Sequence, residues 1–336
     1  NVDEPNPQTP RAAVTNSPKL PPMATDRSAK NENIKIITQN VQGLRSEEKI
    51  EYIIRLMKQK KNQAYLIQET HLAGDYTAEL PEDFLLIHHG PEKQPILGAK
   101  GGVAIILSKE WNDLWKKGGC KTRKRTILIG ETTRILGIDI PIPNNKKNKD
   151  GKNKKGKIIT IMTTYHPHSG YNDEETNAFN QQVAKTYEDI PKNNIIIIGS
   201  DINASIGRRE NNKNNNNDDD NANEDFHIDL LLGPCGNRRV NHKGELFRNL
   251  LQQLDLRAIS TYFSDPNGHD TWINPADNSK FQLDHFFTPR SSFKYIKSVK
   301  KKHYGAPSDH LPLLLTLKID NGKRVRIKLR KRRISK

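Results

Sequence analysis

Short apolar runs recur from Ile34 to Ile319, and each is bounded by glycine, asparagine or charged residues. Runs of this length that are rich in isoleucine, leucine and valine are typical of β-strands. We expect strands at Ile34–Val41, Ala64–Thr70, Phe84–Gly90, Gly101–Ser108, Arg125–Gly130, Arg134–Ile140, Lys157–Pro167, Asn194–Asn203, Arg257–Phe263, Gln282–Thr288, Lys294–Lys300 and Leu313–Ile319. The pattern therefore predicts a protein built mainly from strands.

Three other segments space their apolar residues at i, i+3, i+4 and i+7, which predicts amphipathic helices. The first helix follows Ser46, a residue type that can cap a helix N-terminus. The second follows Asn172, and the third begins near Lys243. Their apolar faces consist of Ile50, Ile53, Ile54 and Met57; of Phe179, Val183 and Tyr187; and of Leu246, Phe247, Leu250, Leu251 and Leu254.

Few helices and many strands favour sheets that pack against each other with helices outside. Several strands, including the one with the run Ile195–Ile198, are too apolar to be buried on one face only. We therefore expect an α/β fold in which a two-sheet β-sandwich is flanked by helices. No apolar run approaches the ~20 residues that a membrane-spanning helix needs, which excludes an integral membrane protein.

Positive charge is concentrated in a few segments. The chain has 55 Lys and Arg residues against 39 Asp and Glu, which gives a formal net charge of +16. Most of the excess lies in Lys116–Arg125, Lys146–Lys157 and Lys323–Lys336. A basic run can be a solvated linker, but such clusters favour a polyanionic partner such as nucleic acid.

The polar segments set the expected domain boundaries. Residues 1–33 are rich in Pro, Asn, Ser and Thr without an apolar period, which predicts a disordered leader. The folded domain is expected at 34–320, with a disordered Asn/Asp-rich insertion at 210–225 and a Lys-rich hairpin tip at 144–157. Residues 321–336 are a basic tail. Because the first residue is Asn rather than Met, we expect a fragment of a longer product.

Polar side chains gather at the ends of the expected strands, where a side chain can leave the core and face a cleft. Five groups are placed at C-terminal strand ends, and a sixth precedes the last strand. They are Asn40; Glu69; Tyr165 with His166 and His168; Asp201 with Asn203; Asp284 with His285; and, in the sixth group, Ser308, Asp309 and His310. Each alone has a plain structural explanation, because Asp and Asn form turns and a single His is usually a satisfied surface residue. Their combination predicts one catalytic site.

Together these motifs resemble the endonuclease/exonuclease/phosphatase superfamily, whose fold is called DNase I-like. The similar motifs are QNVQGLR, IQETHL, TYHPHSG, GSDINA, LDHFF and SDHLPL, in this order between Ile34 and Ile319. The stretch GNRRVNHKGELFRNLLQQLDLRAISTYF, followed by DTWINP, is most similar to the endonuclease domains of non-LTR retrotransposons. The resemblance implies a DNase I-like four-layer α/β sandwich and metal-dependent hydrolysis of phosphodiester bonds.

The residue types suit a magnesium-dependent reaction. Mg²⁺ prefers oxygen ligands and usually takes one or two protein carboxylates. Glu69 is the expected metal ligand, supported by Asn40 and, from across the cleft, by Asp309. We expect Mg²⁺ as the cofactor, with Mn²⁺ as the alternative, to act as a Lewis acid on the phosphate and to stabilise the leaving oxygen.

Five further residues are expected to act on the water and the phosphate. By the resemblance, Asp201 orients and deprotonates the water, and Asn203 holds that water or a phosphate oxygen. His310 contacts the phosphate, and Asp284 fixes the tautomer of its imidazole. Tyr165 donates to the phosphate or assists the leaving group, or else it only covers the core.

Three positions depart from the pattern of the superfamily. Gln42 stands where many repair-type members have Asp, which weakens the interpretation as an apurinic endonuclease. His168 occupies a position that is often Asn, and Ser200 replaces a Gly. The principal catalytic positions are present, so we expect an active enzyme.

The leading hypothesis is a Mg²⁺-dependent endonuclease that nicks DNA, as retrotransposon endonucleases do. The alternatives are an apurinic/apyrimidinic endonuclease or exonuclease of DNA repair, a catalytically inactive nucleic-acid-binding protein and, less favoured by the basic segments, a lipid or inositol phosphatase. Contacts with nucleic acid are expected from Lys146, Lys147, Lys154, Lys155, Arg330 and Arg332. We also expect a monomer, nuclear localisation and, if the chain is a fragment, a reverse transcriptase domain beyond its end.

Overall fold

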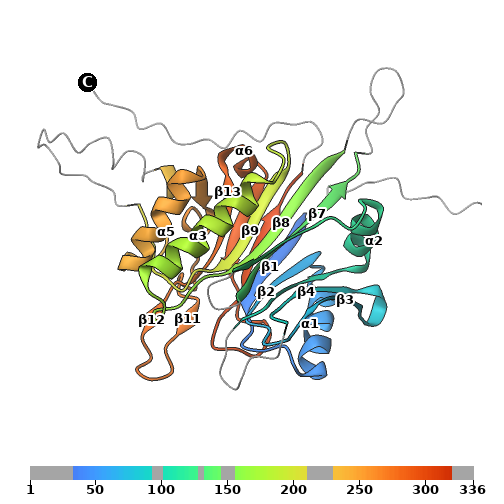
Figure 1. Ribbon diagram of the computed structural model, residues 1–336, viewed down its shortest axis with the longest axis horizontal. Helices are drawn as coiled ribbons and strands as arrows, with labels where there is room; N and C mark the ends of the chain where they lie inside the picture. The colour runs from blue at the N-terminus through green and yellow to red at the C-terminus, as the bar shows by residue number, and fades with distance from the viewer. Residues whose placement is uncertain (1–32, 93–100, 128–131, 145–155, 210–229, 320–336) are drawn as a thin grey trace, which may run out of the picture. The chain divides into compact units, whose positions relative to one another are not determined.

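The computed structural model describes residues 33–92, 101–127, 132–144, 156–209 and 230–319, which form two large sheets and one short sheet (Figure 1). The first sheet has the order β14-β15-β1-β2-β5-β4-β3 and contains β1 (Ile34–Asn40), β2 (Ala64–Gln68), β3 (Asp75–Glu79), β4 (Leu85–His89), β5 (Val103–Leu107), β14 (Ile296–Lys301) and β15 (Leu313–Leu317). The second has the order β10-β13-β9-β8-β7-β6 and contains β6 (Thr122–Ile127), β7 (Thr132–Ile142), β8 (Lys157–Tyr165), β9 (Ile195–Asp201), β10 (Leu256–Ala258) and β13 (Asp284–Pro289). The short sheet pairs β11 (Trp272–Ile273) with β12 (Lys280–Phe281).

The three helices expected from the sequence are present, and each follows a polar residue. The helices of the described residues are α1 (Glu47–Lys60), α2 (Lys109–Lys117), α3 (Asp173–Glu188), α5 (His242–Gln253) and the one-turn α6 (Arg290–Phe293), together with the 3₁₀ turns η1 (Pro81–Asp83) and η2 (Ile259–Thr261). Asn172 caps α3 through a reciprocal capping box with Glu175. Ser46 precedes α1, but its hydroxyl donates to Glu48 instead of accepting from a backbone amide.

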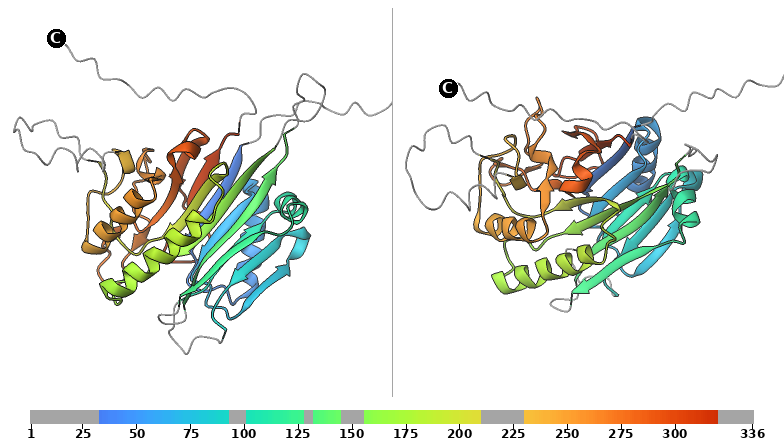
Figure 2. Two further views of the ribbon diagram at one scale, coloured as in Figure 1. Left: turned by 45° about the horizontal axis from the view of Figure 1, so that its top comes forward. Right: turned by 90° about the horizontal axis from the view of Figure 1, so that it is seen from above.

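The isoleucines of β9 show why the sheets stack. Ile195 and Ile197 point into the core between the two sheets, whereas Ile196 and Ile198 lie in a second core beneath α3 and α5. A third core lies between α1 and the outer face of the first sheet. Figure 2 shows the resulting layers, with α1 on one side of the sheets and α3 and α5 on the other. The expected two-sheet α/β sandwich is confirmed.

Two parallel strand pairs lie at the middle of the sandwich. β1 runs parallel to β2 in the first sheet, and β8 runs parallel to β9 in the second. The other paired strands of the described residues run antiparallel to their neighbours. Because the ends of β1 and β9 both carry polar groups, this topology determines where a site can form.

Some elements differ from the sequence-based expectation. The strand expected at Arg257–Phe263 ends at Ala258, because only three residues pair with β13 and the chain then turns in η2. Thr261 Oγ1 donates to the carbonyl oxygen of Ala258 at 2.6 Å and closes this turn. β3, β11, β12 and α2 were not expected, since β3 is largely exposed and polar and the other elements are short.

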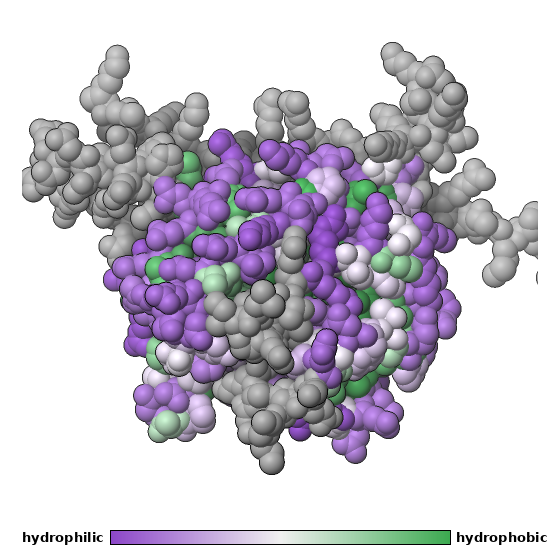
Figure 3. All heavy atoms as spheres, viewed as in Figure 1, coloured by the Kyte–Doolittle hydropathy of each residue, from purple (hydrophilic) through white to green (hydrophobic). Residues whose placement is uncertain are grey.

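The surface is mostly polar on the face shown in Figure 3, where apolar residues are scattered singly between polar ones. Within the described ranges, none of the helices is both long enough and apolar enough to cross a membrane.

β7 and β8 pair antiparallel up to Ile142 and Lys157, on either side of the lysine-rich stretch. That stretch at 145–155 lies outside the described residues, as do 1–32, 210–229 and 320–336.

Candidate active site

Three of the expected catalytic residues meet at one edge of the second sheet. Tyr165 is the last residue of β8 and Asp201 the last residue of β9, and the parallel register places them opposite each other. Asp284 pairs with Asp201 across the antiparallel β9–β13 ladder. The expectation that Asp284 ends a strand was therefore wrong: it is the first residue of β13, and the opposite direction of that strand brings it to the same edge.

The first sheet brings its residues to the same place. Asn40 is the last residue of β1, and Glu69 directly follows β2. His310 precedes β15, which runs antiparallel to β1. The start of β15 therefore lies at the edge where β1 ends, just as the start of β13 lies where β9 ends. Asn40 Nδ2 donates to Asp201 Oδ2 at 2.9 Å and joins the two sheets at this edge.

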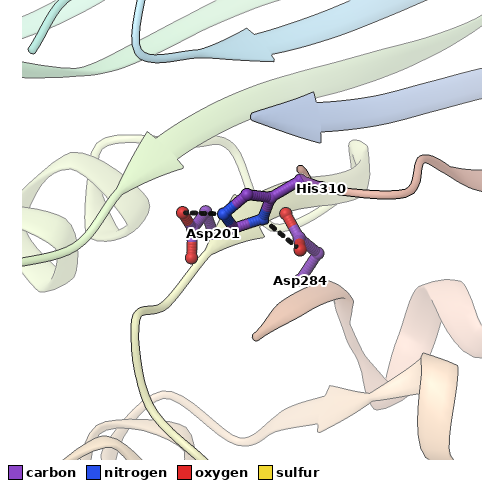
Figure 4. Close-up of side chains that lie close together, drawn as sticks. All are labelled: Asp201, Asp284 and His310. Atoms are coloured by element: carbon purple, nitrogen blue, oxygen red, sulfur yellow. Dashed lines mark hydrogen bonds and ion pairs between the residues drawn. The ribbon is translucent and has the colours of Figure 1, made fainter. Parts of the chain in front are cut away.

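Asp201, His310 and Asp284 form a buried group (Figure 4). His310 Nδ1 lies 2.8 Å from Asp284 Oδ2, and His310 Nε2 lies 4.0 Å from Asp201 Oδ2. Both aspartates have no exposed surface, and His310 is 5% exposed. The imidazole is thus placed between two carboxylates, with one nitrogen held by Asp284 and the other directed toward Asp201.

Burial and charge together set the protonation of this group. Burial raises the pKa of the Asp201 carboxyl, while the neighbouring His310 lowers it. Burial disfavours the charged form of His310, but Asp284 and Asp201 outweigh this effect and raise its pKa above the ordinary value. A cationic imidazole beside carboxylates is therefore favoured at neutral pH.

The backbone around His310 is fixed by neighbouring segments. Gln39 Nε2 donates to the carbonyl oxygen of His310 at 2.7 Å, and Ser308 Oγ donates to that of Asn40 at 2.8 Å. Trp272 pairs with His310 through a backbone bridge. Trp272 Nε1 also donates to Asp309 Oδ2 at 2.8 Å, and so the β11 segment orients the carboxylate next to His310.

A second cluster joins Glu69 to Tyr165. The Tyr165 ring packs in the core between the sheets, and its hydroxyl donates to Glu69 Oε1. His71 Nε2 lies 3.4 Å from Glu69 Oε2. Tyr165 therefore covers the core and also presents its hydroxyl to a carboxylate. A hydrogen bond from this hydroxyl to the phosphate or leaving oxygen stays a prediction.

The loops of the site contain residues in an uncommon backbone conformation. Gln42, Glu69, His71 and Asn203 have φ values of 48°, 54°, 54° and 49°. Residues other than glycine seldom adopt this left-handed region, and such strain persists where the surrounding structure enforces it. The strand ends therefore hold these four residues in one defined arrangement.

Asn203 is anchored beside Asp201. Its backbone amide donates to Asp201 Oδ1 at 3.0 Å, and its Nδ2 donates to the carbonyl oxygen of His166 at 2.8 Å. His166 itself faces away from the cluster, packed edge-on against Phe179 and Phe247. Burial, followed by the charge of Arg134, lowers the pKa of His166 to about 3, so it is a neutral packing residue.

Two further histidines of the sequence motifs have local partners. His285 is buried behind Asp284, with Nδ1 2.8 Å from Ser260 Oγ, and burial lowers its pKa to about 3. His168 Nδ1 accepts a hydrogen bond from the Gly170 amide at 3.1 Å, which shapes the turn after β8.

The donor set agrees with a hard divalent cation. Glu69, Asn40, Asp201 and Asp309 supply oxygen atoms, the ligand type that Mg²⁺ prefers. Asp284 Oδ1 is buried without a hydrogen-bond partner in the described part of the chain. Asp201, Asp284 and His310 offer ligand atoms that lie within 4.8 Å of one another, and a hydrogen bond joins His310 Nδ1 to Asp284 Oδ2. That Glu69, Asn40 and Asp309 hold the metal stays a prediction.

Sequence reasoning missed several residues that shape the site. Trp272 supports Asp309, and Thr271 Oγ1 accepts from the Asp284 amide at 3.0 Å. His71 lies within the IQETHL motif, so its place beside Glu69 was accessible from the sequence. Arg134, by contrast, sits near the start of an ordinary strand, and only the fold shows that its guanidinium lies over the Tyr165 ring at 4.6 Å.

The residues expected to contact nucleic acid lie outside the described residues. They are Lys146, Lys147, Lys154, Lys155, Arg330 and Arg332. Their role stays a prediction from the charge pattern.

Comparisons with known proteins agree with this geometry. A model of the endonuclease/exonuclease/phosphatase family matches residues 37–310. Compared with curated protein sequences, the chain has no significant match. Among solved structures, an AP endonuclease from Leishmania major is 15% identical with a TM-score of 0.56, and covers 86% of this chain and 88% of its own. A 3′-5′ exonuclease from Neisseria meningitidis is 14% identical with a TM-score of 0.54, and covers 85% of this chain and 100% of its own.

The endonuclease domain of TRAS1, a telomere-specific non-LTR retrotransposon, is 13% identical with a TM-score of 0.49, and covers 85% of this chain and 99% of its own. At identities this low, the structural matches with TM-scores above 0.5 speak for the fold alone, whereas the family model spans the segment from β1 to His310 that carries the buried group. On that match, the chain belongs to the endonuclease/exonuclease/phosphatase family.

Proposed function

We propose that this protein is a metal-dependent endonuclease that nicks DNA. Members of the family are hydrolases that act on phosphodiester bonds, and the family is generally dependent on a divalent metal. The observation that supports the proposal most is the convergence of Asp201, Asp284 and His310 from separate segments into one buried group, beside the Glu69–Tyr165 pair. DNA as the substrate is supported by the basic segments, because phosphate neutralisation dominates affinity for DNA.

The Asp201 carboxylate is the proposed general base. Its Oδ1 is oriented by the Asn203 amide and its Oδ2 by Asn40, so the carboxylate is held in one position. Orientation of this kind removes the entropy cost of bringing water to the phosphorus. Because burial raises its pKa, Asp201 is also a better proton acceptor than an exposed aspartate.

His310 is proposed to donate from Nε2 to a phosphate oxygen. Asp284 accepts from Nδ1, which fixes the ring and keeps it protonated. A charged donor stabilises the negative charge that grows on the phosphoryl oxygens in the transition state. Tyr165 would donate to the phosphate or the leaving oxygen, once its hydroxyl exchanges Glu69 for the substrate.

Glu69, with Asn40 and Asp309, would hold Mg²⁺ or Mn²⁺. Such an ion supplies a Lewis acid for the phosphate oxygens and stabilises the leaving group. The left-handed conformation of Glu69 turns its carboxylate out of the β2 ladder and toward Tyr165.

Among DNA nucleases, we propose the retrotransposon type. The support is the sequence resemblance of 236–263 and DTWINP, together with Gln42 at a position where repair-type members have Asp. Within DTWINP, Trp272 contacts both Asp309 and the His310 backbone, so this segment touches two residues of the proposed site.

The test uses supercoiled plasmid with Mg²⁺ or with EDTA, and in parallel a duplex oligonucleotide with or without one abasic site. We expect the protein to convert the plasmid to open circles with Mg²⁺ but not with EDTA. We also expect it to cleave the abasic and the intact duplex at similar rates. A strong preference for the abasic duplex would replace the retrotransposon-type proposal with an apurinic endonuclease. If the protein bound both substrates but cleaved neither, the result would instead support a catalytically inactive nucleic-acid-binding protein.

A further inference from the structure

Arg134 is a buried cation next to the proposed site. It lies in β7 and is 1% exposed, which is rare for arginine. Within the described ranges it makes no ion pair with a carboxylate, and its Nε has no hydrogen-bond partner. A charge in this position is costly unless its surroundings stabilise it, so its contacts indicate what it does.

Two tyrosine rings enclose the guanidinium. Its central carbon lies 4.6 Å from the centroid of the Tyr165 ring and 5.1 Å from that of Tyr171. Nη2 donates to the Tyr171 hydroxyl at 2.8 Å, and Nη1 donates to the His166 carbonyl oxygen at 3.4 Å. The guanidinium therefore lies over the ring of Tyr165 and is held there by hydrogen bonds to the loop that follows β8.

Arg134 and Glu69 contact different parts of Tyr165. The Tyr165 hydroxyl donates to Glu69 Oε1, while the Arg134 guanidinium lies over the ring that carries this hydroxyl. A cation close to a donor group strengthens the hydrogen bond that the group makes to an anionic oxygen. Arg134 is therefore placed to act on the hydroxyl through the ring that it contacts.

We propose that Arg134 is a positioning residue that orients the Tyr165 ring and strengthens its hydroxyl as a donor in the reaction. The inference rests on the proposed nuclease function, in which Tyr165 contacts the phosphate or leaving oxygen. Direct contact between Arg134 and DNA is the rival explanation. It is disfavoured because the guanidinium is buried and its Nη atoms are engaged with Tyr171 and His166.

A double-mutant cycle separates these explanations. Nicking is measured for the unmodified protein, Arg134→Met, Tyr165→Phe and the double variant, each with its thermal midpoint. We expect Arg134→Met to lower kcat about 10-fold with KM nearly unchanged, and to have less than about a 2-fold further effect once Tyr165 is Phe. The inference would be overturned if Arg134→Met lowered kcat equally in the unmodified protein and in the Tyr165→Phe variant. It would also be overturned if Arg134→Met raised KM and made DNA affinity less dependent on salt, because both changes indicate a direct DNA contact.

A second pair of variants guards against unfolding of Arg134→Met. Tyr171→Phe removes one anchor of the guanidinium but leaves its charge, and Arg134→Lys keeps the charge but loses the planar guanidinium. Each should lower kcat less than Arg134→Met does, and neither should matter in the Tyr165→Phe background. If Tyr165→Phe nicks at the unmodified rate, Arg134 has no hydroxyl to assist and the inference fails, while the nuclease function stands.

Discussion

His310 Nδ1 and Asp284 Oδ2 lie 2.8 Å apart, although their segments lead into different sheets and neither residue ends a strand. Asp284 begins β13, and His310 precedes β15. Each enters an antiparallel strand at the edge where β9 and β1 end. The contact orients a buried imidazole toward Asp201, which makes it the geometric centre of the proposed chemistry.

Replacing Asp284 by Asn tests this contact. The variant keeps an acceptor for Nδ1 but removes the charge that keeps the imidazole protonated. We expect kcat for plasmid nicking to fall by about 10²-fold or more, with little change in DNA affinity. Steady-state nicking and a binding titration measure the two effects. An Asp284→Asn variant of unchanged kcat would show that His310 does not act through this carboxylate.

Trp272 should matter through Asp309. Trp272→Phe keeps the aromatic packing but removes the Nε1 donor to Asp309 Oδ2. We expect a fall in nicking rate of about 10-fold, because a misplaced carboxylate weakens the site without abolishing it. The neighbouring Ile273, which is 37% exposed on the same short strand, provides a matched control as Ile273→Ala. Equal rates for the two variants would contradict a role of the indole nitrogen.

Three buried histidines predict a loss of stability in mild acid. Burial lowers the pKa of His88 to about 4, and of His166 and His285 to about 3 each. Since all three lie below the ordinary value of about 6.5, the unfolded chain takes up protons first as the pH falls. The contribution of these three histidines to stability should thus be complete above pH ~6.5 and decline toward pH ~4, with a slope of up to about 1.4 kcal/mol per pH unit for each histidine.

Urea unfolding between pH 5 and 7 checks this prediction, because most carboxylates stay ionised there. His285→Asn retains a group that can bond to Ser260 and should reduce the slope. His242→Asn removes an exposed imidazole and should not reduce it in this way. An identical slope for His285→Asn and the unmodified protein would mean that His285 is not buried as a neutral base.

The basic tail should contribute to DNA binding and not to catalysis. Deleting Lys323–Lys336 removes nine basic residues and no acids. We expect weaker DNA binding and a shallower dependence of affinity on salt, because fewer counterions are released. The nicking rate at saturating DNA should be retained. Affinities that coincide with those of the full chain across a salt series would exclude the tail from the interface.

Much of the fold is accessible from the sequence because the central strands are apolar on both faces. β9 is an example, since Ile195–Ile198 predict burial from two sides and the structure places helices on one side and a sheet on the other. β3 was not accessible, because it is an edge strand with four of five residues exposed and has no apolar period. Strand Arg257–Phe263 was extended too far, because periodicity does not show where a partner strand ends.

As with the fold, some residues of the candidate site could be predicted from the sequence and others could not. Asp201 and His310 lie in motifs that occur in the same order as in the superfamily, so the sequence predicted that they belong to one site. The structure brings the two side chains together. The sequence did not show at which end of its strand Asp284 lies, because a polar residue next to an apolar run can either begin or end a strand. Arg134 and Trp272 act through contacts between distant segments, which no local pattern encodes.

The most direct test of the central claim is the rate of Mg²⁺-dependent nicking of supercoiled plasmid by the unmodified protein, Glu69→Ala and His310→Ala. His242→Ala, at an exposed histidine outside the buried group of Asp201, Asp284 and His310, serves as the control. The account predicts open circles from the unmodified protein and the control, and no nicking by either site variant while most DNA binding remains. Nicking by both site variants at the unmodified rate would contradict it.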